Sequence, residues 1–222
     1  MSSNTEKSLW ENVKSHFQDR SIEWGTIWSW NFRNDPKRLA FVLSRYKFAS
    51  KMAKNAKSVI ELGCGEGIGA PILAEGRFYT GVDYDAPQIE AAKKIFTGDQ
   101  FKFIAGDFFD QTFGQHDLVV SLDVIEHIYQ KYEETYLQAL CANVKENGIV
   151  IVGTPNETTT PYASKLSREA HVNMYSQERM RALFSKYFHN VFCFGMNDEV
   201  VHTGFAQMSQ YLFCVACNKR SL

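Results

Sequence analysis

The chain has 222 residues, a formal net charge of −1, 45% hydrophobic residues and 22% charged residues. This length suits one α/β domain, whose core closes without the help of disulfides or metals. The balanced charge lacks the basic excess typical of proteins that grip many phosphates, so we expect a small-molecule partner and no nucleic acid.

The five cysteines show no disulfide framework, which is typical of a reducing compartment. No apolar run approaches the ~18 residues of a membrane span. The polar start of the chain, residues 1–7, lacks the pattern of a signal peptide. We therefore expect a cytoplasmic protein with no membrane partner, present as a monomer or a homodimer.

The first 56 residues differ from the rest, because they contain all four tryptophans. A helix is predicted over residues 36–54. Since this segment precedes the first predicted strand, we expect an N-terminal helical cap over residues 1–56, lying across a core of residues 57–222. Together they would form a single domain spanning residues 1–222.

From residue 58 onward, predicted strands and helices alternate. Seven strands are expected at residues 58–62, 78–82, 101–105, 117–122, 148–152, 191–194 and 211–216, with helices near 72–75, 86–95, 132–144 and 176–187. This alternation predicts an α/β, Rossmann-like, seven-stranded and mostly parallel sheet with helices on both faces. Ligands of such sheets bind at the carboxyl ends of the strands.

A glycine-rich loop follows the first strand, and it contains Glu61, Gly63, Gly65 and Gly67. Glycine allows positive φ and lets the backbone approach a ligand closely. The loop fails the GxGxxG fingerprint of dinucleotide-binding folds, because Ile68 stands at the third glycine position, and it lacks the Lys-Ser/Thr of a P-loop. A carboxylate before the first glycine favours a cationic ligand over a phosphate.

This loop resembles motif I of the class I methyltransferases that use S-adenosylmethionine (SAM), with the form acidic-x-Gly-x-Gly-x-Gly. Asp83 ends the second strand, where an acidic residue accepts hydrogen bonds from ribose hydroxyls. The resemblance implies that Asp107 bonds the adenine amino group and that Phe108 packs on the ring. The remaining expected cofactor contacts are Tyr84, Leu122 and Arg45, the last for the methionyl carboxylate of SAM.

The segment after the fourth strand contains Asp123, Glu126 and His127 at spacings i, i+3 and i+4. If the chain turns helically there, the three side chains face one side. Methyl transfer needs alignment of the acceptor and removal of its proton. His127 suits a general base, because imidazole exchanges protons near neutral pH. Alternatively, the three residues could hold a divalent metal that activates a hydroxyl.

This run also resembles the acidic-x-x-Glu-His segment of the ubiquinone-biosynthesis O-methyltransferases. The resemblance implies that Asp123, Glu126 and His127 bind a divalent cation, Mg²⁺ or Mn²⁺. His171, downstream, is a candidate for a further metal ligand or for an acceptor contact. Three roles stay open for the segment: a metal site, a metal-free base, or shaping of the pocket without chemistry.

Acceptor contacts are expected from Asn156 after the fifth strand, from His171 downstream and from Trp28 in the cap. The stretch Asp35-Pro36-Lys37-Arg38 is similar to bacterial methyltransferases that act on capsular sugars, including nucleotide-linked heptoses. The leading prediction is therefore methylation of a hydroxyl on a sugar or nucleotide-linked sugar of surface polysaccharide. The alternative is O-methylation of a phenol or quinone precursor, or N-methylation of a small amine.

Overall fold

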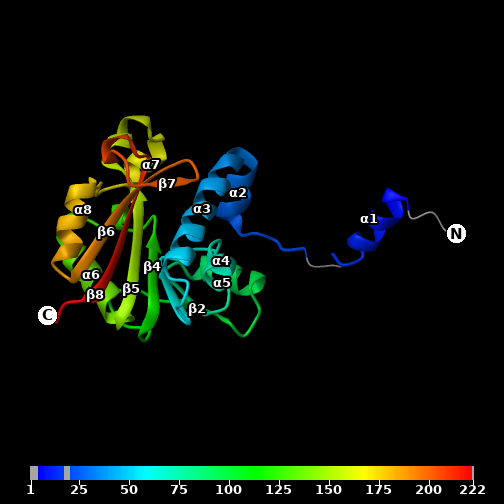
Figure 1. The fold of residues 1–222 in the computed structure, drawn as a ribbon, viewed down its shortest axis with the longest axis horizontal. Helices are drawn as coiled ribbons and strands as arrows, with labels where there is room; N and C mark the ends of the chain where they lie inside the picture. Colours follow the sequence, from blue (N-terminus) through cyan, green and yellow to red (C-terminus); the bar gives the residue numbers. More distant parts are fainter. Residues whose placement is uncertain (1–4, 18–20, 222) are drawn as a thin grey trace.

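The computed structural model describes residues 5–17 and 21–221 (Figure 1). Its centre is one sheet with the strand order β3-β2-β1-β4-β5-β8-β6-β7. Strands β1 to β5 pair with their neighbours in parallel, while β8 is antiparallel to both β5 and β6. The strands are β1 (Ser58–Leu62), β2 (Phe78–Asp83), β3 (Phe101–Ala105), β4 (His116–Leu122), β5 (Val144–Pro155), β6 (Phe188–Asn197), β7 (Val200–His202) and β8 (Tyr211–Lys219).

The sequence predicted the Rossmann-like class correctly but missed one strand of the sheet. The additional strand is β7, which pairs antiparallel with β6 at the sheet edge. It has three residues, too few to show an alternation of apolar and polar side chains. The sheet therefore has eight strands rather than seven.

Helices cover both faces of the sheet (Figure 1). The α-helices are α1 (Glu6–Lys14), α2 (Thr26–Asn34), α3 (Pro36–Met52), α4 (Ala70–Leu73), α5 (Ala86–Ile95), α6 (Glu133–Asn143), α7 (Lys165–Ala170) and α8 (Gln177–Ser185). Short 3₁₀ turns are η1 (Ile125–His127), η2 (Gln130–Tyr132), η3 (Glu157–Tyr162) and η4 (Ala206–Met208). Among the described residues, no helix is both long and apolar enough to cross a membrane.

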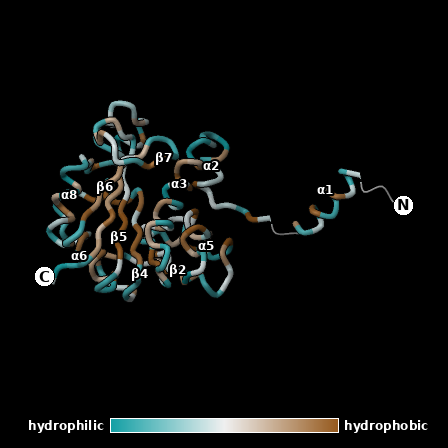
Figure 2. Tube along the Cα trace, viewed as in Figure 1, coloured by the Kyte–Doolittle hydropathy of each residue, from teal (hydrophilic) through white to brown (hydrophobic). Residues whose placement is uncertain are grey.

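Alternating side chains of the strands build two separate hydrophobic cores. In β1, Ile60 and Leu62 belong to the core that α6 and α8 cover, whereas Val59 belongs to the core under α3, α4 and α5. Glu61 shares the second face with Val59, so its carboxylate enters an otherwise apolar layer. Figure 2 shows the central strands as the most hydrophobic part of the trace, with polar segments outside.

Residues 1–56, which were expected to form one cap, contain helices that differ in whether they contact the sheet. Helix α3 packs on the sheet through Val42, Tyr46 and Ala49, and α2 packs against α3. Helix α1 lies apart from the sheet in Figure 1, and none of its residues is buried. The helices that lie close to the carboxyl ends of the strands are therefore α2 and α3.

Candidate functional site

The glycine loop joins β1 to α4 in a conformation that needs its glycines. Gly63, Gly65 and Gly67 have φ angles of 85°, 53° and 76°, in the left-handed region that side chains disfavour. A Cβ on Gly63 would lie 2.4 Å from a methyl carbon of Val124. The positive φ angles thus favour glycine at these three positions. The loop also lies against the segment that follows β4.

Asp83, at the end of β2, holds this loop from the neighbouring strand. One of its carboxylate oxygens accepts the Gly65 N–H at 2.8 Å and the other accepts the Asp85 N–H at 2.9 Å. Both oxygens keep further lone pairs, so Asp83 can accept other donors as well. The expected neighbour Tyr84 is 80% exposed.

The other expected cofactor residues take different positions. The Asp107 carboxylate is exposed at the end of β3 and accepts the Phe109 N–H at 2.8 Å. The Phe108 ring is buried and packs edge-on against Phe109 and Tyr136, while Leu122 is buried in the core under α3. Phe108 therefore contributes to the core in this structure.

Glu61 is fully buried and bonded to two tyrosines. Its oxygens accept the hydroxyl hydrogens of Tyr46, from α3, at 2.7 Å and of Tyr79, from β2, at 2.5 Å. Burial raises the pKa of Glu61 to about 7, although both tyrosine hydrogen bonds act in the opposite direction. The motif carboxylate thus links the cap helix α3 to the sheet.

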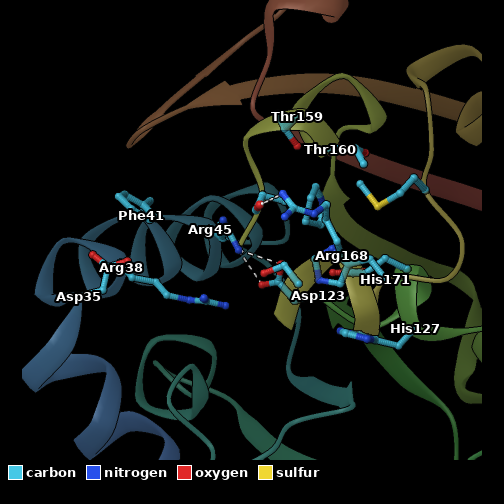
Figure 3. A pocket seen from close by; sticks show the side chains of 15 residues that line it. Asp35, Arg38, Phe41, Arg45, Asp123, His127, Thr159, Thr160, Arg168 and His171 are labelled. Carbon is cyan, nitrogen blue, oxygen red and sulfur yellow. Dashed lines mark hydrogen bonds and ion pairs between the residues drawn. The ribbon is translucent and has the colours of Figure 1, made fainter. Parts of the chain in front are cut away.

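Arg45, expected to bind the methionyl carboxylate of SAM, is paired with Asp123 (Figure 3). Its Nη1 donates to both carboxylate oxygens of Asp123, at 2.8 and 2.7 Å, and its guanidinium stacks 3.8 Å above the Tyr211 ring. Asp123 has a φ of 57°, a strained conformation for a residue with a side chain. The ion pair holds this strained residue in place.

The segment after β4 differs from the expected helical turn. Because Asp123 is left-handed, the helical residues begin at Ile125 and form the short 3₁₀ turn η1. Asp123 therefore stands outside the turn that carries Glu126 and His127. The structure brings three of the four expected metal ligands together and leaves Asp123 paired with Arg45.

The three convergent residues are Glu126, His127 and His171, here called the Glu126 cluster. One ligand atom from each lies within 4.8 Å of the other two. His171 reaches this place because the Glu126 carbonyl accepts the N–H groups of Val172 and Asn173, which fastens the segment after α7 to η1. The two imidazole rings meet edge to face, with 5.0 Å between their centroids.

Glu126 is fully buried, and only part of its carboxylate is satisfied. Oε2 accepts the Thr154 hydroxyl hydrogen at 3.1 Å, whereas Oε1 is buried without a partner among the described residues. Burial, followed by the charge of Asp123, raises the pKa of Glu126 to about 8. A buried oxygen of this kind needs either a proton or a cation.

The two histidines are arranged to offer ring nitrogens. The Nδ1 of His127 lies 3.0 Å from the carbonyl oxygen of Ala170. A carbonyl can only accept, so Nδ1 carries the hydrogen and Nε2 keeps its lone pair. Burial lowers the pKa of His171, and the neighbouring His127 and Arg38 act in the same direction, which favours a neutral imidazole.

A cavity of about 270 Å³ opens beside the Glu126 cluster, between α3 and the segment from β5 to α7 (Figure 3). Its wall includes Asp35, Arg38, Phe41 and Arg45 of the cap, together with Asp123. The opposite wall is made by Pro155, Thr159, Thr160, Ala163, Ser167, Arg168 and Met174. The cavity thus has a mixed lining, in which apolar side chains stand beside several charged groups.

Two residues expected to contact an acceptor have other partners. The Asn156 amide donates to the carbonyls of Ala206 and Ser209, and its oxygen caps η3 through the Thr158 N–H. Trp28 is half-buried against the core under α3. Neither residue belongs to the cavity lining, in contrast to His171.

Some residues of the candidate site had no signal in the sequence. Arg168 reaches the cavity wall through the packing of α7, and no local spacing marks it. Glu66 is a further example, because its carboxylate accepts the N–H groups of Ile27 at 2.9 Å and Trp28 at 3.1 Å, which caps the start of α2. Two residues of the stretch Asp35-Pro36-Lys37-Arg38, Asp35 and Arg38, line the cavity.

Comparisons with known proteins agree with this geometry. Residues 32–188, more than half of the chain, match the family model described as a methyltransferase domain. The "Ubiquinone biosynthesis O-methyltransferase" of Rickettsia felis is 27% identical in an alignment of 172 residues that covers 73% of this chain. The match covers 66% of that relative, so the chain spans slightly less than two thirds of its length.

Two solved structures have the same fold at low sequence identity. The plantazolicin methyltransferase BpumL in complex with SAH has a TM-score of 0.65 at 14% identity, covering 86% of this chain and 88% of that one. A TehB-like SAM-dependent methyltransferase from Corynebacterium glutamicum has a TM-score of 0.62 at 17% identity, covering 97% and 96%. With the motif I loop, the sheet order and the matched family model, the chain belongs to the class I SAM-dependent methyltransferases.

Proposed function

We propose that this protein transfers a methyl group from SAM to a hydroxyl of a small phenolic acceptor, of the quinone-precursor class, with help from a divalent cation. The name of the Rickettsia felis relative supports a quinone precursor over the sugar acceptor predicted first. The sugar or nucleotide-linked sugar predicted first rests on the resemblance of short sequence stretches, such as residues 35–38, and none of the relatives reported above is named for it.

The observation that carries this proposal is the buried, unpartnered Oε1 of Glu126 beside two imidazoles. One carboxylate and two histidines form a donor set that fits a divalent cation. Nitrogen ligands favour Mn²⁺ over Mg²⁺, which prefers oxygen ligands throughout. The residues present therefore fit a cation bound by Glu126, His127 and His171.

The roles of the chain's own residues follow from their contacts. Thr154 holds one oxygen of Glu126, which orients the other toward the cluster. The Ala170 carbonyl fixes the His127 ring with the Nε2 lone pair available. When bound, the cation lowers the pKa of a coordinated hydroxyl. The cavity walls then align the acceptor oxygen for in-line attack on the methyl group.

Without a cation, His127 could take the proton itself, as a general base. Its Nε2 lone pair is available for either role. An amine acceptor would need neither device, because it can attack through a neutral lone pair. A reaction that depends on a metal or on His127 therefore supports a hydroxyl acceptor, whereas an amine acceptor would react without either.

The test is methyl transfer from SAM to 3,4-dihydroxybenzoate, compared with transfer to a small primary amine. We expect the phenolic activity to vanish with a chelator and to return with Mn²⁺. Glu126→Gln should lower kcat by at least about 100-fold, the scale of proton-transfer catalysis, while the affinity for S-adenosylhomocysteine stays unchanged.

Glu169→Gln is the matched control, because Glu169 lies on the neighbouring helix α7, is exposed and does not line the cavity. It should retain wild-type activity. If transfer to the phenol resists the chelator but is lost when His127 is changed, His127 acts as a general base and no metal is needed. Transfer to the amine alone would contradict the proposal.

A further inference from the structure

Two arginines enter the cavity from opposite walls. Arg38 comes from the first turn of α3 and Arg168 from the end of α7 (Figure 3). In Figure 3 the Arg38 side chain extends from α3 toward the space in front of Asp123. Both arginines line the same cavity as the Glu126 cluster.

These two arginines differ from Arg45 in their partners. Arg45 is neutralised by Asp123 at 2.7 Å. Among the described residues, no carboxylate lies within 4 Å of the Arg38 or Arg168 guanidinium. Arg168 donates through Nη1 to the Ala163 carbonyl, which holds its guanidinium at the wall. Its remaining N–H groups are available to a ligand.

Within the described part of the chain, the two arginines are the cationic groups of the cavity that have no acidic partner. The lining carries Arg38, Arg45 and Arg168, and of these Arg45 is paired with Asp123. Arg38 and Arg168 are exposed, so they can exchange water for an anion that enters the cavity. Because the two guanidiniums are exposed, salt screens their attraction for an anion.

We propose that Arg38 and Arg168 bind an anionic substituent of the acceptor, a carboxylate or a phosphate, while its hydroxyl lies at the Glu126 cluster. This rests on the proposed function, because it assumes that the cavity holds the acceptor. Guanidinium groups suit both anions, since their paired N–H groups match two oxygens at once. A cavity of about 270 Å³ is slightly smaller than the ~300–1,000 Å³ of drug-sized sites, so the acceptor is a small acid.

The test compares binding of charged and neutral acceptors by isothermal titration, in the presence of S-adenosylhomocysteine. The probes are 3,4-dihydroxybenzoate, its amide 3,4-dihydroxybenzamide, and glucose 1-phosphate as a small phosphate-bearing acceptor. We expect the wild type to bind one of the two anionic probes at least about tenfold more tightly than the amide, as for a charge-assisted hydrogen bond. Which probe binds distinguishes a carboxylate from a phosphate.

Arg38→Gln and Arg168→Gln should each remove most of this preference and leave binding of the amide unchanged. Lys37→Gln is the matched control, because Lys37 is an exposed cation beside Arg38 that does not line the cavity. Its preference should equal that of the wild type.

If neither anionic probe binds more tightly than the amide, the inference is overturned. The inference is also overturned if Lys37→Gln loses as much of the preference for the anion as Arg38→Gln and Arg168→Gln do. The same probes assayed for methyl transfer separate the two proposals. If the protein prefers the anionic probes but methylates none of them, the arginine site is supported and the proposed methylation of a phenol is contradicted. If it methylates the phenolic probes but binds the acid no more tightly than the amide, the proposed function is supported and the arginine site is contradicted.

Discussion

Asp83 illustrates how one side chain at a strand end can control a ligand loop. Its carboxylate accepts the N–H groups of Gly65 and Asp85, one on each oxygen. In Asp83→Asn, an amide NH₂ would face one of these N–H groups, and the negative charge would be lost. We expect the affinity for S-adenosylhomocysteine to fall by about tenfold or more, measured by isothermal titration.

The control for this change is Glu90→Gln, which alters an exposed carboxylate on the nearby helix α5. Its affinity should remain that of the wild type. If Asp83→Asn binds S-adenosylhomocysteine as tightly as the wild type does, Asp83 neither contacts the cofactor nor shapes the loop that does.

Residues of this kind could be predicted because their signals are local. The spacing of Gly63, Gly65 and Gly67 reflects positive φ angles within one loop, which few sequences satisfy by chance. Glu126 and His127 are adjacent to a strand that was also predicted. Arg168 could not be predicted, because its role depends on where α7 packs, and nothing in its own neighbourhood indicates a ligand.

At the scale of the element, the start of α2 is held by a side chain from the glycine loop. The Glu66 carboxylate is buried and accepts the Ile27 and Trp28 N–H groups. In Glu66→Gln the charge that complements these N–H groups is lost, so we expect α2 to loosen. Native-state hydrogen exchange should show faster exchange at Ile27 and Trp28, and the free energy of unfolding should fall by about 1–2 kcal/mol.

Glu75→Gln, at an exposed carboxylate after α4, serves as the control and should change neither measurement. Gly25→Ala should resemble Glu66→Gln, because its Cβ would lie 2.3 Å from the Glu66 carboxyl carbon. Unchanged exchange in both variants would mean that α3 alone keeps α2 in place.

The elements themselves could be predicted where a pattern repeats over several residues. Strand β4 is apolar on both faces, and Ser176 caps α8 as its type suggests. Strand β7 is too short for any period. The turn η1 differs from the expected helix because Asp123, held by Arg45 from α3, adopts a left-handed conformation. That partner lies 78 residues away in the chain.

For the whole molecule, the alternation of strands and helices predicted at which edge of the sheet the site lies, but not which later segments complete the site. The motifs follow β1, β2, β3 and β4, so a parallel sheet brings them to one edge. The insertion of β8 between β5 and β6, and the joining of His171 to η1 through the Glu126 carbonyl, are tertiary events. They depend on packing between segments that no local pattern relates.

The buried carboxyl of Glu61 connects the site to the stability of the whole fold. Burial raises its pKa from 4.5 to about 7, so between these values the folded protein keeps a proton that the unfolded chain has released. The contribution of Glu61 to stability is therefore complete below about pH 4.5 and is lost as the pH rises toward 7. Glu61→Gln keeps a neutral side chain at every pH.

We therefore expect the unfolding free energy of the wild type, relative to Glu61→Gln, to fall between pH 5 and 7, by at most about 1.4 kcal/mol per pH unit. Urea unfolding of both proteins at four pH values measures this difference. Other titrating groups, including Glu126, are common to both proteins and cancel in the comparison. A difference that stays constant with pH would mean that Glu61 is ionised in the fold, stabilised as an anion by the hydroxyls of Tyr46 and Tyr79.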